Sequence, residues 1–241
     1  MGKHNQGIHT AYTPGNQTPD ATQYGVDMRG TTDTTKQVHD RASTSYDREH
    51  DGGFWNWVQK TLFKDGDVNS QVHNETSQDA STLAQGVTTR QAPGIPGTNY
   101  MTYQHDGLKS MVKDGVNPGM SMQMSDAWIQ LGNDMVGHQN SFVTAIGNSE
   151  TEWRGASGDS ARNFMADVAN YIGKAGQSAQ LAGKQESLHS QALSTAGNSM
   201  PDPINFDAAG DWTVRFHFYE TCNDAPEDSP HGHAAFFVHV P

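Results

Sequence analysis

The stretch that decides the fold runs from residue 124 to residue 155 and reads MSDAWIQLGNDMVGHQNSFVTAIGNSETEWRG. Its apolar and small residues recur at alternating spacings of four and three, the period of a helix that lies along another helix. The pattern therefore predicts a long helix that ends near the sequence Glu152-Trp153-Arg154-Gly155. Members of this first stripe are Met124, Trp128, Leu131, Met135, His138, Phe142, Ala145 and Ser149.

Both ends of this helix carry sequence signals. Ser125 and Asp126 form a start signal before Trp128, and the sequence Asn117-Pro118-Gly119 indicates a turn upstream. At the other end, Trp153 and Gly155 mark the predicted turn of a hairpin. The purely structural interpretation is that the Trp153 side chain closes the hairpin end while Gly155 supplies the turn.

A second stripe with the same period follows the turn and predicts a second helix over residues 157–198. Ser157 is its predicted N-cap, and Pro201 prevents its continuation. Small residues fill positions 173–183, so a close-packed neighbour is expected there. The sequence thus predicts a mainly α fold built on a long antiparallel helical hairpin.

A hairpin alone buries its stripes poorly, because both edges of its seam stay open. We expect either a short predicted helix at 104–114 or a second protein to complete a bundle. The residues expected to form the helix seam and to bind a partner are Met124, Trp128, Leu131, Met135, Phe142, Met165, Val168, Ile172 and Leu193.

The rest of the chain divides by composition. Residues 1–53 contain no Leu, Phe, Trp or Cys and are predicted to be disordered. Residues 54–98 combine a short amphipathic helix at 54–63, which either packs on the main domain or adheres to a partner or membrane interface, with a Pro/Gly linker at 92–97. Residues 99–206 form the predicted helical domain. Residues 207–241 form an accessory tail with strand-like alternation, read as a short β-hairpin.

Composition excludes several functions. A net charge of −12 argues against binding to nucleic acid or anionic membranes. No apolar run reaches the roughly 18 residues of a membrane span, and the N-terminus lacks the apolar core of a signal peptide. No nucleophile elbow, P-loop, dinucleotide fingerprint or HExxH motif is present, so neither an enzyme nor a cofactor is expected. A metal site is not predicted in the tail, because its candidate ligands are scattered: His217, Cys222, His231, His233 and His239.

Residues 99–206 resemble the PPE-like and Trp-x-Gly (WXG) helical-hairpin proteins of actinobacterial type VII (ESX-type) secretion systems. The resemblance rests on Asn99-Tyr100, on His105 with Leu108 and Val112, and on three longer runs. These are Trp128-Ile129-Gln130-Leu131-Gly132-Asn133, Glu152-Trp153-Arg154-Gly155-Ala156-Ser157-Gly158-Asp159-Ser160-Ala161, and Asn198-Ser199-Met200-Pro201-Asp202-Pro203.

The resemblance implies a non-enzymatic protein that pairs with a small Trp-x-Gly or PE-like helical partner. It also implies export as a folded pair to the envelope or medium, with a secretion chaperone and the secretion ATPase as further candidate partners. No tyrosine is followed by an acid four positions later, so the family's Tyr-x-x-x-Asp/Glu signal is missing and the partner is expected to supply it. Two alternatives stay open: a delivery module for a truncated C-terminal effector, and a cytosolic helical scaffold.

Overall fold

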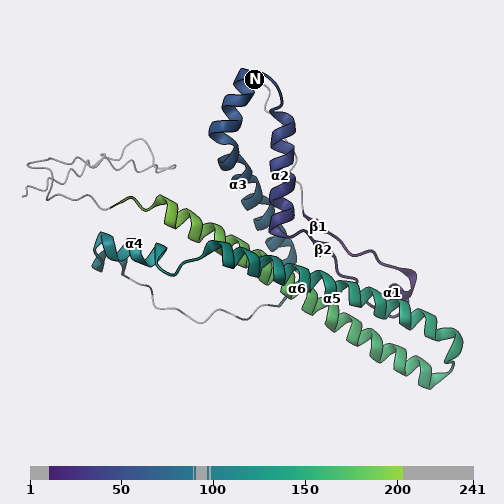
Figure 1. The fold of residues 1–241 in the computed structure, drawn as a ribbon. Coiled ribbons are helices and arrows are strands. Elements are labelled where there is room, and N and C mark those ends of the chain that lie inside the picture. Colours follow the sequence, from purple (N-terminus) through teal and green to yellow (C-terminus); the bar gives the residue numbers. More distant parts are fainter. Residues whose placement is uncertain (1–10, 89, 91–96, 98, 203–241) are drawn as a thin grey trace, which may run out of the picture. The chain divides into compact units, whose positions relative to one another are not determined.

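A computed structural model describes residues 11–88, 90, 97 and 99–202 of the 241-residue chain. The described part is mainly helical, which confirms the predicted fold class. Its two longest helices, α5 (Pro118–Glu152) and α6 (Ala156–Ser199), run antiparallel along each other (Figure 1). The hydroxyl of Ser190 in α6 donates to the carbonyl of Pro118 over 2.7 Å, so the end of α6 lies against the start of α5.

Helix α5 begins earlier than predicted. The Asn117 side chain caps it by accepting a hydrogen bond from the Met120 amide over 3.0 Å, and Pro118 occupies the first helical position. Proline suits that position because its fixed φ matches the helix and its missing N–H would have no partner there. The predicted start at Ser125 is wrong, and the predicted turn at 117–119 is a helix cap followed by the first turn.

The turn between α5 and α6 consists of Trp153, Arg154 and Gly155. Gly155 has a φ of +95°, a backbone conformation that is strained for a residue with a side chain. Glycine is therefore required at this position. Helix α6 starts at Ala156, directly after this glycine, so Ser157 lies inside the helix and is not its cap.

The prediction that residues 1–53 are disordered is wrong for residues 11–53, while residues 1–10 lie outside the described part. Strands β1 (Tyr12–Thr13) and β2 (Thr31–Thr32) pair antiparallel around helix α1 (Pro19–Gln23). Helix α2 (Thr35–Glu49) follows. The segment is held by hydrogen bonds to α5 and α6 together with small apolar clusters, and composition alone does not reveal these contacts.

Helix α3 (Phe54–Ala84) is much longer than the short helix predicted at 54–63. It packs beside α2, and the two share a buried apolar cluster made of Ala11, Val38, Ala42, Tyr46, Val68 and Val72. Val68 and Val72 lie outside the predicted helix at 54–63, and Leu62 and Phe63 of that stretch are exposed.

Residues 11–88 and 99–200 belong to one packed unit rather than to two domains that meet near residue 98. Helix α3 contacts α6, and α2 contacts α5. The predicted linker at 92–97 lies outside the described residues except for Gly97. In the chain this linker joins two parts of one packed unit, whereas the sequence predicted a boundary between two domains there.

The short helix predicted at 104–114 is confirmed as α4 (His105–Lys113), preceded by a 3-10 turn η1 (Tyr100–Thr102). Helix α4 contacts α6. Helix α6 ends at Ser199, shortly before Pro201 as predicted. The tail at 207–241, including its predicted β-hairpin and its histidines, lies outside the described residues.

Candidate partner-binding face

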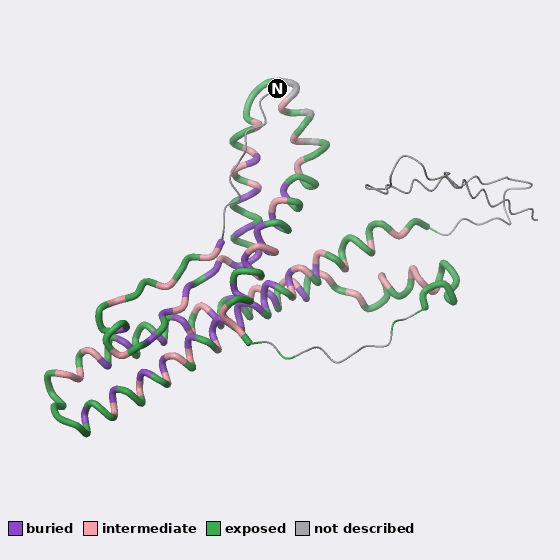
Figure 2. The backbone as a smooth tube through the Cα atoms, turned by 180° about the vertical axis from the view of Figure 1, so that it is seen from behind, coloured by how far each residue is buried: buried purple, intermediate pink, exposed green. Residues whose placement is uncertain are grey.

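The seam between α5 and α6 lies one residue away from the predicted stripes. In α5 the buried residues are Ser125, Ile129, Gly132, Val136, Gln139, Val143 and Ile146, each one position after a predicted member. In α6 the same offset gives Arg162, Ala166, Ala169, Gly173, Gly176, Gln180 and Gly183. The prediction that the apolar stripes form this seam is therefore wrong. Figure 2 shows the buried positions recurring where the two helices face each other.

Glycine explains the offset, because it lets the two backbones approach closely. A methyl group at Gly132 would lie 2.6 Å from the carbonyl oxygen of Gly176, closer than atoms tolerate. A methyl group at Gly183 would lie 2.6 Å from Ile129 Cγ1. The close-packed neighbour expected along residues 173–183 is thus α5, and the larger side chains of the stripes cannot occupy so narrow a seam.

One face of the hairpin is covered by residues 11–84. The residues that bind this covering layer lie one position after the seam, such as Asn133 in α5 and Asn170 and Gln177 in α6. The Asn133 amide donates to the Thr32 carbonyl over 2.8 Å, and its oxygen accepts from the Thr32 amide over 3.1 Å. The Gln177 amide donates to the Leu83 carbonyl over 2.9 Å. Side-chain amides therefore replace a continuous apolar contact on this face.

A buried ion pair fastens α3 to α6 on the same face. Lys184 Nζ lies 2.9 Å from Asp79 Oδ2, and neither side chain is exposed to solvent. Lys184 also donates to the Asp33 carbonyl over 2.9 Å. A buried charge is expensive to leave without its partner, so this pair fixes where α3 sits on α6.

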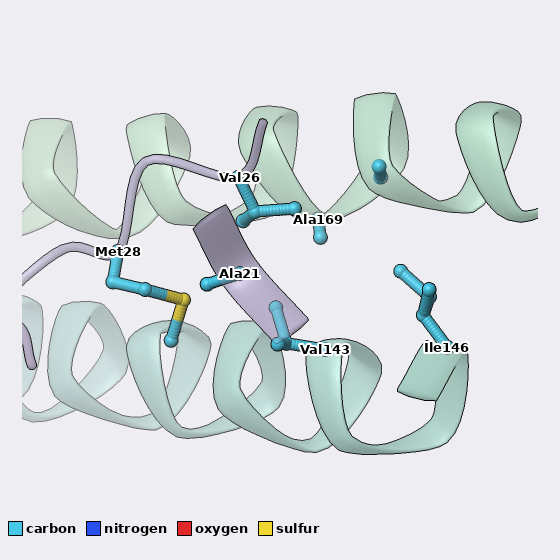
Figure 3. Packing of buried hydrophobic residues seen from close by; sticks show 7 residues of the cluster. Ala21, Val26, Met28, Val143, Ile146 and Ala169 are labelled. Atoms are coloured by element: carbon cyan, nitrogen blue, oxygen red, sulfur yellow. The ribbon is translucent and has the colours of Figure 1, made fainter. Parts of the chain in front are cut away.

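A small apolar cluster anchors α1 between the two long helices. Figure 3 shows Ala21 and Val26 reaching the gap between α5 and α6, where they meet Val143, Ile146 and Ala169. Beside this cluster the Tyr24 hydroxyl donates to the Glu150 carboxylate, and burial together with this contact raises the pKa of Tyr24. The covering layer thus reaches the last turn of α5.

The opposite face of the hairpin carries the predicted stripes. Each residue turns a helix by about 100°, so residues one position before the seam point away from residues one position after it. Because α5 and α6 are antiparallel, the earlier positions of both helices lie on the same side. We call this side the open face. It consists of the α5 row (Met124, Trp128, Leu131, Met135, His138, Phe142, Ala145) and the α6 row (Ala161, Met165, Val168, Ile172, Ala175, Ala179, Ala182).

Large apolar side chains on the open face are accessible. Trp128 is 42% exposed and Leu131 is 47% exposed, and Met124 and Phe142 are also exposed. Met135, Met165, Val168 and Ile172 are half-buried, as is Leu193 near the end of α6. The predicted partner-binding residues other than Leu193 are therefore brought together on one surface, although not in the seam.

The open face is almost without charge. As far as Ala145 and Ala182, neither row contains Lys, Arg, Asp or Glu, and His138 is the one titratable side chain of these rows. The next member of the predicted α6 stripe, Glu186, is a half-buried carboxylate that accepts a hydrogen bond from Ser121. The lack of charge in the rows contrasts with a chain whose net charge is −12. A contiguous exposed apolar patch of this kind marks an interaction site in soluble proteins.

Arg162 closes the end of the hairpin, whereas the sequence predicted that the Trp153 side chain would do so. The Trp153 side chain is exposed, whereas Arg162 is buried and donates to the Trp153 carbonyl over 2.8 Å. Arg162 also bonds Asp159, over 2.5 Å. The arginine therefore satisfies the carboxyl end of α5, and Trp153 itself remains available at the tip.

No three His, Cys, Asp or Glu side chains gather as metal ligands among the residues that the structure describes. A groove of about 1160 Å³ between α3, the start of α5 and the end of α6 is lined by amides and hydroxyls together with apolar groups such as Met122 and Leu188, and His73 is bonded to Gln191 there over 3.1 Å. No helix in the described ranges has the length and apolar character needed to cross a membrane.

Sequence reasoning missed the residues that hold the covering layer: Asn133, Gln139, Asn170, Gln177, Gln180 and Lys184. Five of the six are amides, at seam positions or one position after them, where a solvent-exposed helix more often carries charged residues. That excess of amides was the available signal.

Compared with protein-family models, with curated proteins and with solved structures, the chain matches none.

Proposed function

We propose that this chain is a non-enzymatic binding protein whose open face pairs with a small helical protein. The observation that supports this most directly is the pair of adjacent apolar rows on α5 and α6, in which the large side chains of Met124, Trp128, Leu131 and Phe142 are exposed. Burial of apolar surface is the main source of affinity in such contacts, at about 25 cal/mol per Å². A partner that presents an apolar helical face would complete a bundle around these rows.

The chemistry of the open face restricts the partner. Because the rows lack charged residues, a matching surface gains little from ion pairs and loses affinity if it buries a charge of its own. The partner is therefore expected to present an apolar stripe with polar residues at its edges. Association through such a surface should depend weakly on salt, since screening acts on charges.

The type VII resemblance supplies the biological setting of the proposal. In this setting the partner is a small Trp-x-Gly or PE-like helical protein, and the pair leaves the cell by a route that needs no signal peptide. The chain lacks a Tyr-x-x-x-Asp/Glu signal. The partner is proposed to carry that signal, so export of this chain depends on pairing.

Co-expression with candidate small Trp-x-Gly or PE-like helical proteins from the same genome tests the proposal. The full chain should co-purify with one of them. Trp128→Glu should reduce the recovered partner at least about tenfold, because it buries a charge in a desolvated aromatic position. The matched control is Gln130→Glu, which adds the same charge to an exposed position of α5 outside the α5 row.

Two results would contradict the proposal. One is failure of every such small protein to co-purify with the unaltered chain. The other is undiminished recovery of a partner by Trp128→Glu. The alternative function, delivery of a C-terminal effector, depends on residues 207–241, which lie outside the described part.

A further inference from the structure

Residues 25–35 cross the covered face of the hairpin as an extended segment, which we call the strap. Asn170 of α6 donates to the carbonyl of Gly25, and Lys184 of α6 donates to the carbonyl of Asp33. These two positions of α6 are about 21 Å apart at about 1.5 Å per residue. The strap covers that length at about 2.6 Å per residue, well above the rise of a helix, so its backbone is extended.

Side-chain amides of the hairpin bind the main chain of the strap through pairs of hydrogen bonds. The Gln139 amide nitrogen donates to the Asp27 carbonyl, and the Gln139 oxygen accepts from the Arg29 amide, both over 2.9 Å. Asn133 bonds the amide and the carbonyl of Thr32 in the same way. Every residue except proline offers the same N–H and carbonyl, so these contacts recognise an extended backbone whatever its side chains.

Alternate side chains of the strap point into the hairpin. Val26 and Met28 are buried, and Figure 3 shows both directed toward the space between α5 and α6. Asp27 and Thr31 lie between buried positions and are exposed. The hairpin therefore accommodates apolar or small residues at every second position of the bound segment and leaves the positions between them free to vary. The buried series is Val26, Met28, Gly30, Thr32 and Thr34.

The binding groups of the hairpin are themselves buried and held in place. Gln139 and Gln180 are fully buried, and Gln180 donates to the Gly30 carbonyl over 3.0 Å. Gln180 also donates to the side-chain oxygen of Asn133 over 2.9 Å, which fixes the two amides relative to each other. Buried amides without a hydrogen-bonding partner are costly, so this face of the hairpin requires a bound segment that supplies carbonyls and N–H groups.

We infer that the covered face of the hairpin is a binding site for an extended peptide, and that the strap is its resident ligand. The ligand class is a peptide with apolar or small residues at alternate positions, bound mainly through its main chain. Because the strap is part of the same chain, its effective concentration at the site is high and it excludes free peptides of this class. A free peptide takes the same arrangement only when the strap is released.

The contacts of the strap release more readily than those between the long helices. Its apolar burial is concentrated at Val26 and Met28, and its hydrogen bonds exchange with water at little net cost. Its other edge pairs with the two-residue strand β1. Segments with few buried apolar contacts open locally while the rest of a fold persists. The strap is therefore expected to detach while α5 and α6 stay paired.

Hydrogen exchange of the unaltered full chain tests whether the strap behaves as a bound ligand. The main-chain amides of Asp27, Arg29 and Thr32 should exchange at least about tenfold faster than those of Ile129 and Val136 in the seam, because local release is easier than separation of the helices. Equal protection of both groups, as in exchange through global unfolding alone, overturns the inference.

A labelled peptide of residues 24–36 tests the site in trans. Val26→Ser combined with Met28→Ser in the full chain weakens the strap and leaves the hairpin side chains unchanged. This double variant should bind the peptide at least about tenfold more tightly than the unaltered chain, whose strap occupies the site. Thr31→Ser, at an exposed strap position, is the control and should bind no better than the unaltered chain. Fluorescence anisotropy measures binding, and circular dichroism checks helical content.

The amides are tested within the double variant. Adding Gln139→Leu removes two bonds to the main chain and should weaken peptide binding at least about tenfold, whereas Gln130→Leu, at an exposed position of α5, should not. A double variant that stays helical and binds no peptide up to about 200 μM overturns the inference.

Equal binding of a peptide that carries the Val26→Ser and Met28→Ser substitutions overturns the inference as well, since the alternation of side chains would then play no part. If the double variant loses its helical content, the exchange measurement on the unaltered chain decides. The site lies on the face opposite the open face, so none of these results bears on partner pairing, which co-expression measures separately.

Discussion

The two faces of the α5–α6 hairpin are built from opposite kinds of residue. The covered face carries amides and a buried lysine, and residues 11–84 bind them through hydrogen bonds such as those of Asn133 and Gln177. The open face carries tryptophan, leucine, methionine and phenylalanine, and the described chain leaves them exposed. The face that looks polar in the sequence is the one that the chain buries.

The polar contacts of the covered face fix one arrangement of the chain, whereas the apolar side chains of the open face can bind different surfaces. Hydrogen bonds to amides and a buried ion pair fix one arrangement, because any other leaves polar groups unsatisfied. Apolar rows accept any surface of matching shape. The chain thus uses its polar face for its own fixed layer and keeps its apolar face for a contact that can be exchanged.

The largest effect is expected from breaking the covered face at its ion pair. Lys184→Ala leaves Asp79 buried without its counter-charge and should lower the free energy of unfolding by about 3–5 kcal/mol. Urea denaturation followed by circular dichroism measures this. Lys174→Ala, at an exposed position of the same helix, should change stability by less than about 0.5 kcal/mol.

A double variant separates charge from packing at that site. Lys184→Met with Asp79→Leu removes both charges and should recover most of the lost stability. If the double variant is as unstable as Lys184→Ala, shape rather than charge pairing holds α3 to α6.

A smaller effect is expected at the seam that divides the two faces. Gly132→Ala places a methyl group 2.6 Å from the Gly176 carbonyl and should cost about 1–3 kcal/mol of stability through overpacking. Gly137→Ala is the matched control in the same helix. A methyl group there has open space, so it should stabilise the protein by about 0.5–1 kcal/mol. Equal effects of the two substitutions would contradict the close approach of α5 and α6.

The smallest effect is expected from an exposed ion pair within the covering layer. Asp47 accepts from Lys64 over 2.8 Å, and this hydrogen bond lowers the pKa of Asp47. A carboxyl whose pKa is lower in the folded state stabilises the fold above its unfolded pKa of about 3.9, and this contribution disappears as pH falls through the folded value. Asp47→Asn should therefore lower the melting temperature slightly at pH 7 and leave it unchanged at pH 2. An equal shift at both pH values would argue against the ion pair.

The sequence predicted α5 and α6, because their apolar periodicity is sustained over many turns, and it predicted the short α4 from the helical spacing of a few apolar residues. It also located the turn, where Gly155 is needed for its positive φ. The predicted seam differs from the observed one by one residue, because two stripes that are offset by one position have the same spacing. Hydrophobicity favours the stripe with Trp128, while close packing favours the stripe with Gly132.

The order of residues 11–84 was missed for another reason. Their partners on α5 and α6 are 90 or more positions away in the chain, as in the bonds of Thr35 to Ser125 and to Asp126. Local composition carries no sign of such contacts. The candidate site was found nonetheless, since the residues that periodicity selected do lie together, on an exposed surface instead of in a seam.

Comparison of Trp128→Ala with Ile129→Ala tests the central claim most directly, because these neighbours lie on different sides of the one-residue offset. Trp128 is 42% exposed and Ile129 is fully buried. In urea denaturation at low protein concentration, Ile129→Ala should cost about 2–5 kcal/mol and Trp128→Ala less than about 0.5 kcal/mol. A large loss for Trp128→Ala with little change for Ile129→Ala would place the apolar stripe in the seam and contradict the open face.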